Sequence, residues 1–232
     1  MIESKQMENA LTSDILHDIK NYAAGIEGNI ALLSRQYPSD PRISKTARLV
    51  SDCCRGILSL SANVLDIGKF EDHKISLEKE KFSVKRFFDL LDDFRGKSMF
   101  EEKNISFKFL DNTNGLLVIE ADPYLLERIM ENLFRNAARY VPRNGNVALT
   151  LESGNDENII CLFNSGLPVP DADREIIFDK YSSLESKGSP YSKGQGLFFC
   201  KLALSAHDGR IWLETDQNGN YFKIAFKKTK DT

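Results

Sequence analysis

The segment from Asp14 to Asn21 (DILHDIKN) groups side chains that can accept, hold and release a transferred chemical group. His17 is followed directly by Asp18, and Asn21 lies one helical turn further on, on the same side. Apolar residues recur around the segment in steps of three or four, at Leu11, Ile15, Ile19, Ala23, Ile26, Ile30 and Leu33. Such spacing predicts one buried face of a helix, and at about 100° per residue His17 points away from that face into water. A solvated surface histidine without a chemical role is the alternative interpretation.

A second polar group occurs in the stretch ERIMENLFRNAARY, residues 127–140. Asn132, Asn136 and Arg139 follow one another at helical spacing, beside an apolar stripe on the same predicted helix. Asparagine is a poor helix former, so two of them one turn apart need a reason. Their amide oxygens can ligate Mg²⁺ while phosphates supply the negative charge, and Arg139 can bind a phosphate. A polar stripe that faces solvent is the alternative.

Two glycine-containing segments further along the chain are typical of ligand-binding turns. The first, FNSGLPVP, leaves a strand and turns sharply; there Gly166 lets the backbone approach a ligand, and Asn164 can hydrogen-bond a base. The second, KGQGL, contains Gly194, Gly196 and Leu197 and precedes a helix, whose first N–H groups can bind phosphate. Each turn alone is weak evidence, and the order of the segments carries more weight.

The stretch from Ser182 to Lys193 is rich in serine and glycine and predicts a mobile lid over a ligand. Lys180, Lys187 and Lys193 are candidate phosphate neighbours, although exposed lysines most often only add solubility.

Composition limits the class of protein. The chain has 232 residues, of which 41% are hydrophobic and 28% charged, which fits a soluble protein of one large or two ordinary domains. The net charge of −3 gives no indication of nucleic-acid binding. No run of about 18 apolar residues and no signal-peptide core occurs. The four cysteines lack zinc-site spacing, so we expect reduced cysteines in a cytoplasmic setting.

Two long helices are expected at the N-terminal end. The first runs from near Ile2 to about Arg35, and after a break Asp40 caps a second helix whose first residue is Pro41. The second helix has a heptad rhythm at Ile43, Ala47, Val50, Cys54, Ile57, Ser61, Val64 and Gly68. A lone hairpin cannot enclose two wide apolar faces, so we expect a homodimer with a four-helix bundle. This first domain covers residues 1–72.

The second domain, residues 73–232, mixes helical and strand patterns. Helices are expected from Phe87 to Phe94, after Asp122 to Tyr140, and from Gly194 to Ala206. Strands are expected at 105–109, 116–119, 147–151, 159–163, 211–213 and 222–226, the last two joined around Asn218-Gly219-Asn220. The predicted architecture is an α/β sandwich with one sheet covered by helices, and the fold class of the whole chain is α+β.

Together these segments resemble the catalytic core of a two-component sensor histidine kinase. His17–Asn21 resembles the family's phosphoacceptor box, and Glu131–Tyr140 resembles its magnesium-nucleotide box. Asn164–Gly166 resembles the first glycine box, Ile177–Tyr181 the phenylalanine box, and Gly194–Leu197 the second glycine box. His207–Ile211 resembles the turn that follows, and the segments occur in the family's order. The match covers nearly the whole chain. It implies a dimerising phosphoacceptor hairpin followed by an ATP-binding domain of the GHKL type.

The sequence departs from the family's pattern at several positions. Asn164 stands where the family usually has Asp, and Pro168 where it usually has a second glycine. The Asp normally binds the adenine amino group; an Asn carbonyl can still accept, but losing the charge weakens nucleotide binding by roughly 1–2 kcal/mol. Phe198 replaces a further glycine of the second glycine box, and Tyr22 replaces a common proline, so the first helix is expected to run straight.

The resemblance also implies the chemistry and its residues. The γ-phosphate of ATP would pass to His17, with Asp18 holding the second ring nitrogen, and then to an aspartate of a response-regulator receiver domain. Asn21 would position a water for dephosphorylation of that regulator. The expected ATP-binding residues are Asn132, Asn136, Arg139, Tyr140, Asn164, Gly166, Lys180, Gly194, Gly196 and Leu197, with Asn132 and Asn136 as Mg²⁺ ligands. No nucleic-acid partner is expected, and membrane contact is expected only through a sensor region upstream.

Two other classes of protein stay open at this point. A phosphotransfer or scaffold protein with a degenerate nucleotide site would fit Asn164 and Pro168, whereas the asparagine pair and the GQGL segment oppose it. A GHKL serine kinase or ATP-driven clamp would fit the nucleotide motifs, but the His17 segment and the predicted hairpin argue against it.

Overall fold

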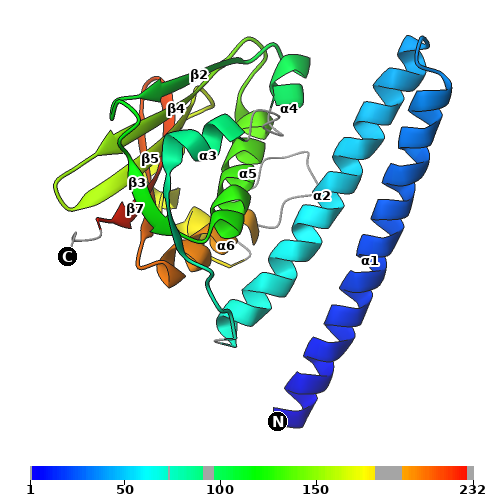
Figure 1. Ribbon diagram of the computed structural model, residues 1–232, viewed down its shortest axis with the longest axis horizontal. Coiled ribbons are helices and arrows are strands. Elements are labelled where there is room, and N and C mark those ends of the chain that lie inside the picture. Colours follow the sequence, from blue (N-terminus) through cyan, green and yellow to red (C-terminus); the bar gives the residue numbers. More distant parts are fainter. Residues whose placement is uncertain (1, 73, 91–96, 181–194, 229–232) are drawn as a thin grey trace. The chain divides into compact units, whose positions relative to one another are not determined.

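The computed structural model describes residues 2–72, 74–90, 97–180 and 195–228. The chain divides into two compact units, Met1–Ile75 and Ser76–Thr232 (Figure 1). None of the described helices is long and apolar enough to cross a membrane. All four cysteines are free, as expected.

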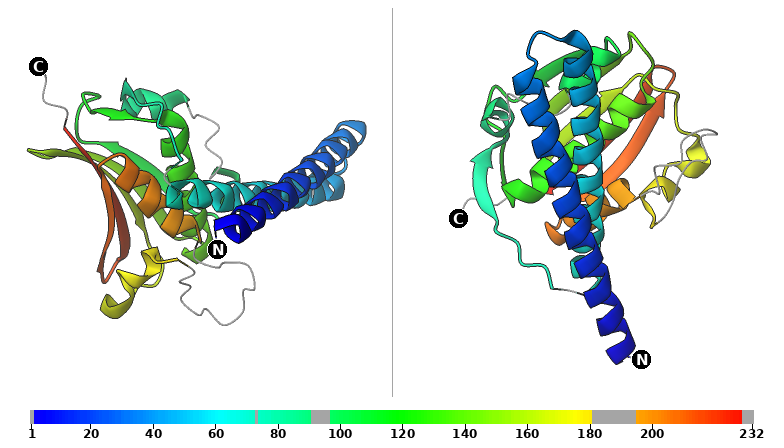
Figure 2. Two further views of the ribbon diagram at one scale, coloured as in Figure 1. Left: turned by 90° about the horizontal axis from the view of Figure 1, so that it is seen from below. Right: turned by 90° about the vertical axis from the view of Figure 1, so that its right-hand side faces the viewer.

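The first unit is a hairpin of two long helices, α1 (Ile2–Gln36) and α2 (Pro41–Glu71), which lie side by side in Figures 1 and 2. The Asp40 side chain accepts hydrogen bonds from the backbone N–H groups of Arg42, at 2.8 Å, and Ile43, at 3.4 Å. This N-cap satisfies donors that have no partner within the helix, and it confirms the predicted start of α2.

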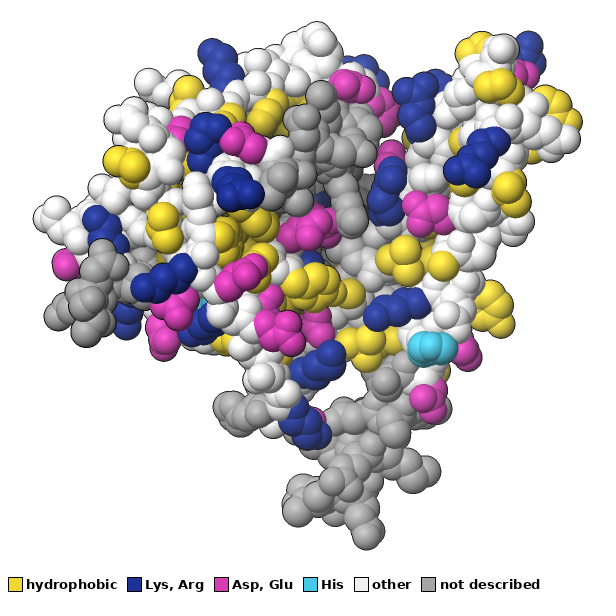
Figure 3. Space-filling model, in the orientation of Figure 1, with side chains coloured by type: hydrophobic (Ala, Val, Ile, Leu, Met, Phe, Trp, Pro, Cys, Tyr) yellow, Lys and Arg dark blue, Asp and Glu magenta, His cyan; other side chains and the backbone are white. Residues whose placement is uncertain are grey.

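The hairpin covers only part of the apolar surface of its helices. Leu16 and Ala23 of α1 are buried, as are Ala47 and Cys54 of α2. The predicted stripe is mostly exposed along α1 and mostly buried or half-buried along α2, because one partner helix covers only one sector of another. Its exposed members are Ile15, Ile19, Ile26, Leu33 and Ile57, and Leu49 and Leu60 are exposed as well. Figure 3 shows hydrophobic side chains at the surface along the hairpin.

The second unit is built on a five-stranded sheet in the order β2-β4-β5-β7-β6. Its strands are β2 (Ser106–Asp111), β4 (Asn146–Ser153), β5 (Glu157–Asn164), β6 (Arg210–Asp216) and β7 (Gly219–Lys227). Only the β2–β4 pair is parallel. The helices α5 (Pro123–Tyr140) and α6 (Gln195–Ala206) lie on one face of the sheet (Figures 1 and 2).

The core lies between these helices and the sheet. Alternate residues of the strands point into it, which is why Leu149, Leu151 and Leu162 are almost fully buried. Ile129 and Leu133 of α5 are buried as well, together with Phe199 and Leu204 of α6. The predicted helices at 122–140 and 194–206 and the predicted strands of this sheet are confirmed to within a few residues.

The prediction of a single sheet is wrong, because β1 (Glu80–Ser83) and β3 (Val118–Ala121) form a separate antiparallel pair. No strand was predicted at residues 80–83, because a pattern with so few apolar residues gives no strand signal. Between the strands lie α3 (Val84–Leu90) and the unpredicted α4 (Lys97–Glu102). Two short 3₁₀ helices, η1 (Asp171–Asp173) and η2 (Ile176–Phe178), follow β5.

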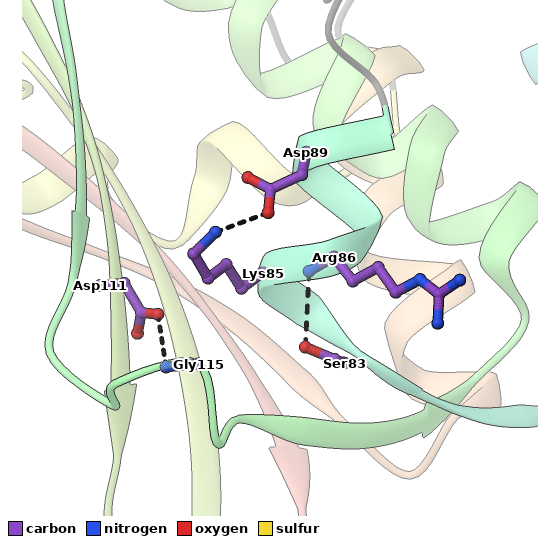
Figure 4. Close-up of polar contacts among 6 residues, drawn as sticks. All are labelled: Ser83, Lys85, Arg86, Asp89, Asp111 and Gly115. Atoms are coloured by element: carbon purple, nitrogen blue, oxygen red, sulfur yellow. Dashed lines mark hydrogen bonds and ion pairs between the residues drawn. The ribbon is translucent and has the colours of Figure 1, made fainter.

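Polar contacts fix the start of α3 and the turn after β2 (Figure 4). The Ser83 hydroxyl accepts from the Arg86 N–H at 3.4 Å, and Lys85 forms an ion pair with Asp89 at 2.5 Å. Asp111 accepts from the Gly115 N–H at 2.7 Å. Because this turn extends to Gly115, strand β3 begins at Val118 and not at residue 116 as predicted.

The last hairpin also turns one residue earlier than predicted. Asp216 pairs with Gly219 in the β6–β7 register, so Gln217 and Asn218 form the turn. The Asp216 carboxylate accepts from the backbone N–H groups of Asn218 and Gly219, at 2.8 Å and 3.2 Å, and holds it closed.

Candidate functional site

His17 is exposed on α1, as predicted. The residue that contacts its ring nitrogen Nδ1 is Asn21, whereas Asp18 was expected there. The side chains of His17 and Asp18 are 72% and 73% exposed, and 4.0 Å separates Nδ1 of His17 from the nearest Asp18 oxygen, too far for a hydrogen bond. Asn21 instead places its amide nitrogen 3.2 Å from the same Nδ1. When an amide N–H donates to Nδ1, the proton of a neutral imidazole must sit on Nε2.

In the second unit, Asn132 faces the start of α6. Its side chain is 6% exposed, so the solvent-facing alternative does not describe this asparagine. Its Nδ2 donates to the Arg128 carbonyl at 2.8 Å, which turns Oδ1 toward Gly196. A β-carbon on Gly196 would come within 2.7 Å of that oxygen. The structure therefore brings together the predicted asparagine and the second glycine segment.

Aromatic and cationic side chains hold α5 against α6 at this point. The Arg128 guanidinium carbon lies 4.3 Å from the centre of the Phe199 ring and 5.6 Å from that of Tyr124. Burial lowers the pKa of Arg128 from its ordinary value. The Cys200 thiol also donates to the Ile129 carbonyl at 3.7 Å. These contacts fix the position of the α6 N-terminus relative to Asn132.

The other predicted residues of α5 lie toward its C-terminal end. Asn136 and Arg139 are half-buried, and Tyr140 is 47% exposed. The Arg139 guanidinium lies 5.4 Å from the centre of the Tyr140 ring, and its buried Nη2 has no hydrogen-bond partner among the described residues. Lys103 donates to the carbonyls of Arg139 and Val141, at 3.0 Å and 3.1 Å, and so caps this end of the helix.

The first glycine segment packs against the same end of α5. A β-carbon on Gly166 would lie 3.0 Å from the Tyr140 carbonyl oxygen, so only glycine fits without a shift. Asn164 is 2% exposed, and its Oδ1 accepts from the Gly166 N–H at 3.2 Å and from Nδ2 of Asn220 at 3.3 Å. The carbonyl oxygen that was expected to bind the adenine amine is thus already bonded within the protein.

Two residues of this region, Asn220 and His207, were not predicted to take part in the site. Asn220 lies opposite Asn164 in the β5–β7 register, and a strand pattern gives no sign of that pairing. His207 is buried; its Nε2 accepts from the Asp122 N–H at 2.9 Å, and its Nδ1 lies 2.7 Å from the Ala203 carbonyl oxygen. Asp122 in turn caps α5 through the Leu125 N–H, so His207 ties the end of α6 to the start of α5.

The remaining predicted residues are less informative. Leu197 is half-buried in the first turn of α6, and Lys180 is exposed just after η2. Gly194, Lys187, Lys193 and the predicted lid from Ser182 to Lys193 lie outside the described residues.

The residues present fit a nucleotide with Mg²⁺. The amide oxygen of Asn132 lies beside Gly196, where the absence of a side chain leaves room for it. A neutral oxygen is a suitable Mg²⁺ ligand where phosphates complete the coordination.

Comparisons with known proteins relate the chain to ATPases and histidine kinases. Residues 121–230 match the family of histidine kinase-, DNA gyrase B-, and HSP90-like ATPases. The adaptive-response sensory kinase SasA of Nostoc sp. is 22% identical over 232 residues, covering 94% of this chain and 57% of SasA. The chain thus spans little more than half the length of this curated relative.

Solved structures of histidine kinases share the fold. The catalytic domain of ThkA is 26% identical, with a TM-score of 0.58, over 66% of this chain and 99% of that domain. ThkA in complex with the response regulator TrrA matches 98% of this chain and 64% of that chain, at 24% identity and a TM-score of 0.59. Full-length ShkA in complex with AMPPNP matches 96% of this chain and 47% of its own, at 18% identity and a TM-score of 0.69.

The fold and the glycine and asparagine segments define the second unit as an α/β ATPase domain of the GHKL type. Together with the kinase relatives and the likeness to the ThkA catalytic domain, they support a two-component histidine kinase catalytic core.

Proposed function

We propose that this core transfers the γ-phosphoryl group of ATP to His17 and from there to an aspartate of a response-regulator receiver domain. The Asn132 oxygen directed at Gly196 is the observation that supports nucleotide binding most directly. The structure of ThkA with its response regulator supports the class of partner. We further propose a cytoplasmic location for these residues.

The ATP site is proposed to lie along α5. Asn132 and Asn136 would hold Mg²⁺ through their amide oxygens, and Mg²⁺ would neutralise charge on the phosphates. The half-buried Arg139 supplies a guanidinium N–H for a phosphate oxygen. Tyr140 and the Asn164–Gly166 turn would border the base, because Gly166 packs on the Tyr140 backbone. Lys180, Gly194, Gly196 and Leu197 complete the proposed binding residues.

In the transfer step, a bond forms between one His17 ring nitrogen and the γ-phosphorus while the bond to the ADP oxygen breaks. Attack through Nε2 requires the ring proton to be on Nδ1. The Asn21 N–H that faces Nδ1 opposes this proton position. The Asn21 amide must therefore turn over, or Asp18 must come within hydrogen-bonding distance of Nδ1, before Nε2 can attack.

A radiolabelling experiment tests the transfer. After incubation with γ-labelled ATP and Mg²⁺, the chain should carry acid-labile label, and His17→Gln should carry none. Asn29→Ala, a change at another exposed position of α1, should keep the label and serves as the control. Label that persists in His17→Gln would refute the assignment of His17.

The hairpin is proposed to form a four-helix bundle with a second copy of the chain. The exposed members of the stripe, Ile15, Ile19 and Ile26 among them, support a homodimer, because large apolar side chains at regular helical spacing gain most from burial.

One observation favours a second candidate function. Because the Asn164 oxygen is bonded to Gly166 and Asn220, the site lacks the acceptor that the family uses for adenine. An ATP-independent phosphotransfer or scaffold protein would fit that feature. Calorimetric titration with ADP and Mg²⁺ separates the two candidates, since only the kinase requires measurable binding.

A further inference from the structure

Two buried asparagines, Asn164 at the end of β5 and Asn220 at the start of β7, are joined in one network of hydrogen bonds. They are 2% and 3% exposed. Nδ2 of Asn220 donates to Oδ1 of Asn164 at 3.3 Å, to the Leu167 carbonyl at 3.0 Å and to the Gly166 carbonyl at 3.4 Å. The network therefore joins the first glycine segment to the last strand of the sequence.

Backbone N–H groups fix which way both amides point. The Val169 N–H donates to Oδ1 of Asn220 at 2.9 Å, and the Gly166 N–H donates to Oδ1 of Asn164 at 3.2 Å. A backbone N–H can only donate, so a turn of either amide would set donors against donors. Both described hydrogen bonds of the Asn164 side chain end on its oxygen, and its amide nitrogen has no hydrogen bond among the described residues.

The backbone around Asn164 has little room to relax. A β-carbon on Gly219 would lie 2.1 Å from the Asn164 carbonyl oxygen, and one on Gly166 would lie 3.0 Å from the Tyr140 carbonyl. The turn is therefore held between the start of β7 and the end of α5. A ligand that binds beside Asn164 meets an amide whose orientation is already set.

We propose that Asn164 presents an amide N–H to the nucleobase and that Asn220 and the Gly166 N–H together set this orientation of the amide. The site consequently discriminates weakly between purines with an amine and purines with a carbonyl at position 6. This inference rests on the proposed nucleotide function and concerns the base that the same site accepts. Adenine offers a donor at its 6-amino group, whereas guanine offers an acceptor at O6. A donor on the protein cannot pair with that amine, but it can pair with a 6-carbonyl or with the unprotonated ring nitrogen N1 of adenine.

The test compares ADP with inosine diphosphate, whose base carries a carbonyl in place of the 6-amine. Calorimetric titration of the full chain with each nucleotide in the presence of Mg²⁺ should give affinities within about 10-fold of each other. Asn164→Asp keeps an oxygen for Gly166 and Asn220 and replaces the amide nitrogen by a second oxygen. This variant should prefer ADP by roughly 10- to 100-fold, the range of a hydrogen bond to a charged group.

A second variant separates the setting of polarity from a general structural role. Asn220→Ala removes one of the two donors that hold the Asn164 oxygen and leaves only the Gly166 N–H, so the Asn164 amide turns more easily and the preference for ADP should rise above that of the wild type. If Asn220 had a purely structural role, its replacement would weaken the binding of both nucleotides equally and leave the ratio of the two affinities unchanged. This comparison also keeps the proposal testable if Asn164→Asp does not fold.

The outcomes are distinct. A wild-type preference for ADP of more than about 10-fold, or an unchanged ratio of the two affinities in both variants, would overturn the inference and leave nucleotide binding intact. Binding of neither nucleotide to the wild type would overturn the proposed kinase function itself, and the inference with it.

Discussion

At the residue scale, Asn132 and Gly196 show how a main-chain hydrogen bond directs a side chain toward its chemistry. Asn132 donates its amide N–H to the Arg128 carbonyl, so its oxygen faces Gly196 in the first turn of α6. Asparagine in the middle of a helix costs stability relative to better helix formers. Here the cost is offset by a bond within the helix, and the oxygen is held at a defined place.

The first prediction is that Gly196→Ala lowers nucleotide affinity by about 10-fold or more with little loss of stability. The new β-carbon would come within 2.7 Å of the Asn132 oxygen and must displace it, whereas alanine itself suits a helix. Calorimetry with ADP and Mg²⁺ measures the affinity. Gly28→Ala is the control, because a β-carbon there meets nothing within 4 Å. Equal affinities in the two variants would contradict the role given to the Asn132 oxygen.

Asn21 is the second residue whose contacts predict a separable effect. Its amide N–H faces Nδ1 of His17 and favours the proton position that opposes attack by Nε2. Asn21→Ala should therefore autophosphorylate at least as fast as the wild type. Loss of the Asn21 amide should also slow dephosphorylation of a phosphorylated regulator by about 10- to 100-fold, which is the scale of a lost contact that positions a water.

Two rates on one preparation test this prediction: label gained by the kinase and label lost from the regulator. ATP affinity should be nearly unchanged. If both rates fall together, or neither changes, Asn21 does not act selectively in dephosphorylation.

At the element scale, His207 and Asp122 position α5, which carries most of the predicted nucleotide-binding residues. Asp122 accepts from the Leu125 and Glu78 N–H groups, both at 3.1 Å, while its own N–H donates to His207. Burial lowers the pKa of His207, Lys79 lowers it further, and the bond to Ala203 with the charges of Asp122 and Asp208 opposes the shift. The bond in which Nε2 accepts from the Asp122 N–H also requires the neutral form of His207.

The pH dependence of stability follows from that shift. The unfolded chain takes up a proton on this histidine near its ordinary pKa of 6.5, and the folded chain does so only at lower pH. The contribution of His207 to stability is thus present above pH 6.5 and is lost as the pH falls below it. His207→Gln can keep the bond from Asp122 but cannot gain a proton.

Melting temperatures of the wild type and His207→Gln, measured from pH 8 down to pH 5, test this third prediction. The variant should melt a few degrees lower at pH 8, since a lost buried hydrogen bond costs about 1 kcal/mol. The gap should narrow toward pH 5. A constant difference across the range would show that His207 does not titrate differently on folding.

The elements also show what a sequence can predict. Helix starts were predictable because Asp40 and Asp122 are capping residues followed by proline, and both cap their helices. Strands with alternating apolar residues were predictable as well, because that signal also lies in neighbouring residues of the sequence. The β1–β3 pair, the Asn164–Asn220 contact and the burial of His207 join residues far apart in the chain, so no local pattern contains them.

At the scale of the whole molecule, the first unit leaves a surface that its own fold does not cover. Ile15 is 51% exposed, Ile26 is 49% exposed, and Ile57 is 41% exposed. Other apolar residues of the same two helices, Ile19, Leu33, Leu49 and Leu60, are exposed as well. Burying a side chain of this size stabilises an association by about 1.5–3 kcal/mol. Several such residues on each copy supply a strong reason for the hairpins to pair.

The last prediction is that the chain is a dimer at micromolar concentration and that Ile26→Glu makes it a monomer. A carboxylate placed in an apolar interface loses its water without gaining a partner, and two copies bring two such charges into one bundle. Light scattering should give twice the chain mass for the wild type and the single mass for the variant. Tyr37→Glu is the control, because Tyr37 is exposed at the hairpin turn, outside the stripe, and its replacement should leave the dimer intact. A monomeric wild type would remove the four-helix bundle, whereas a dimeric Ile26→Glu would move the interface away from this stripe.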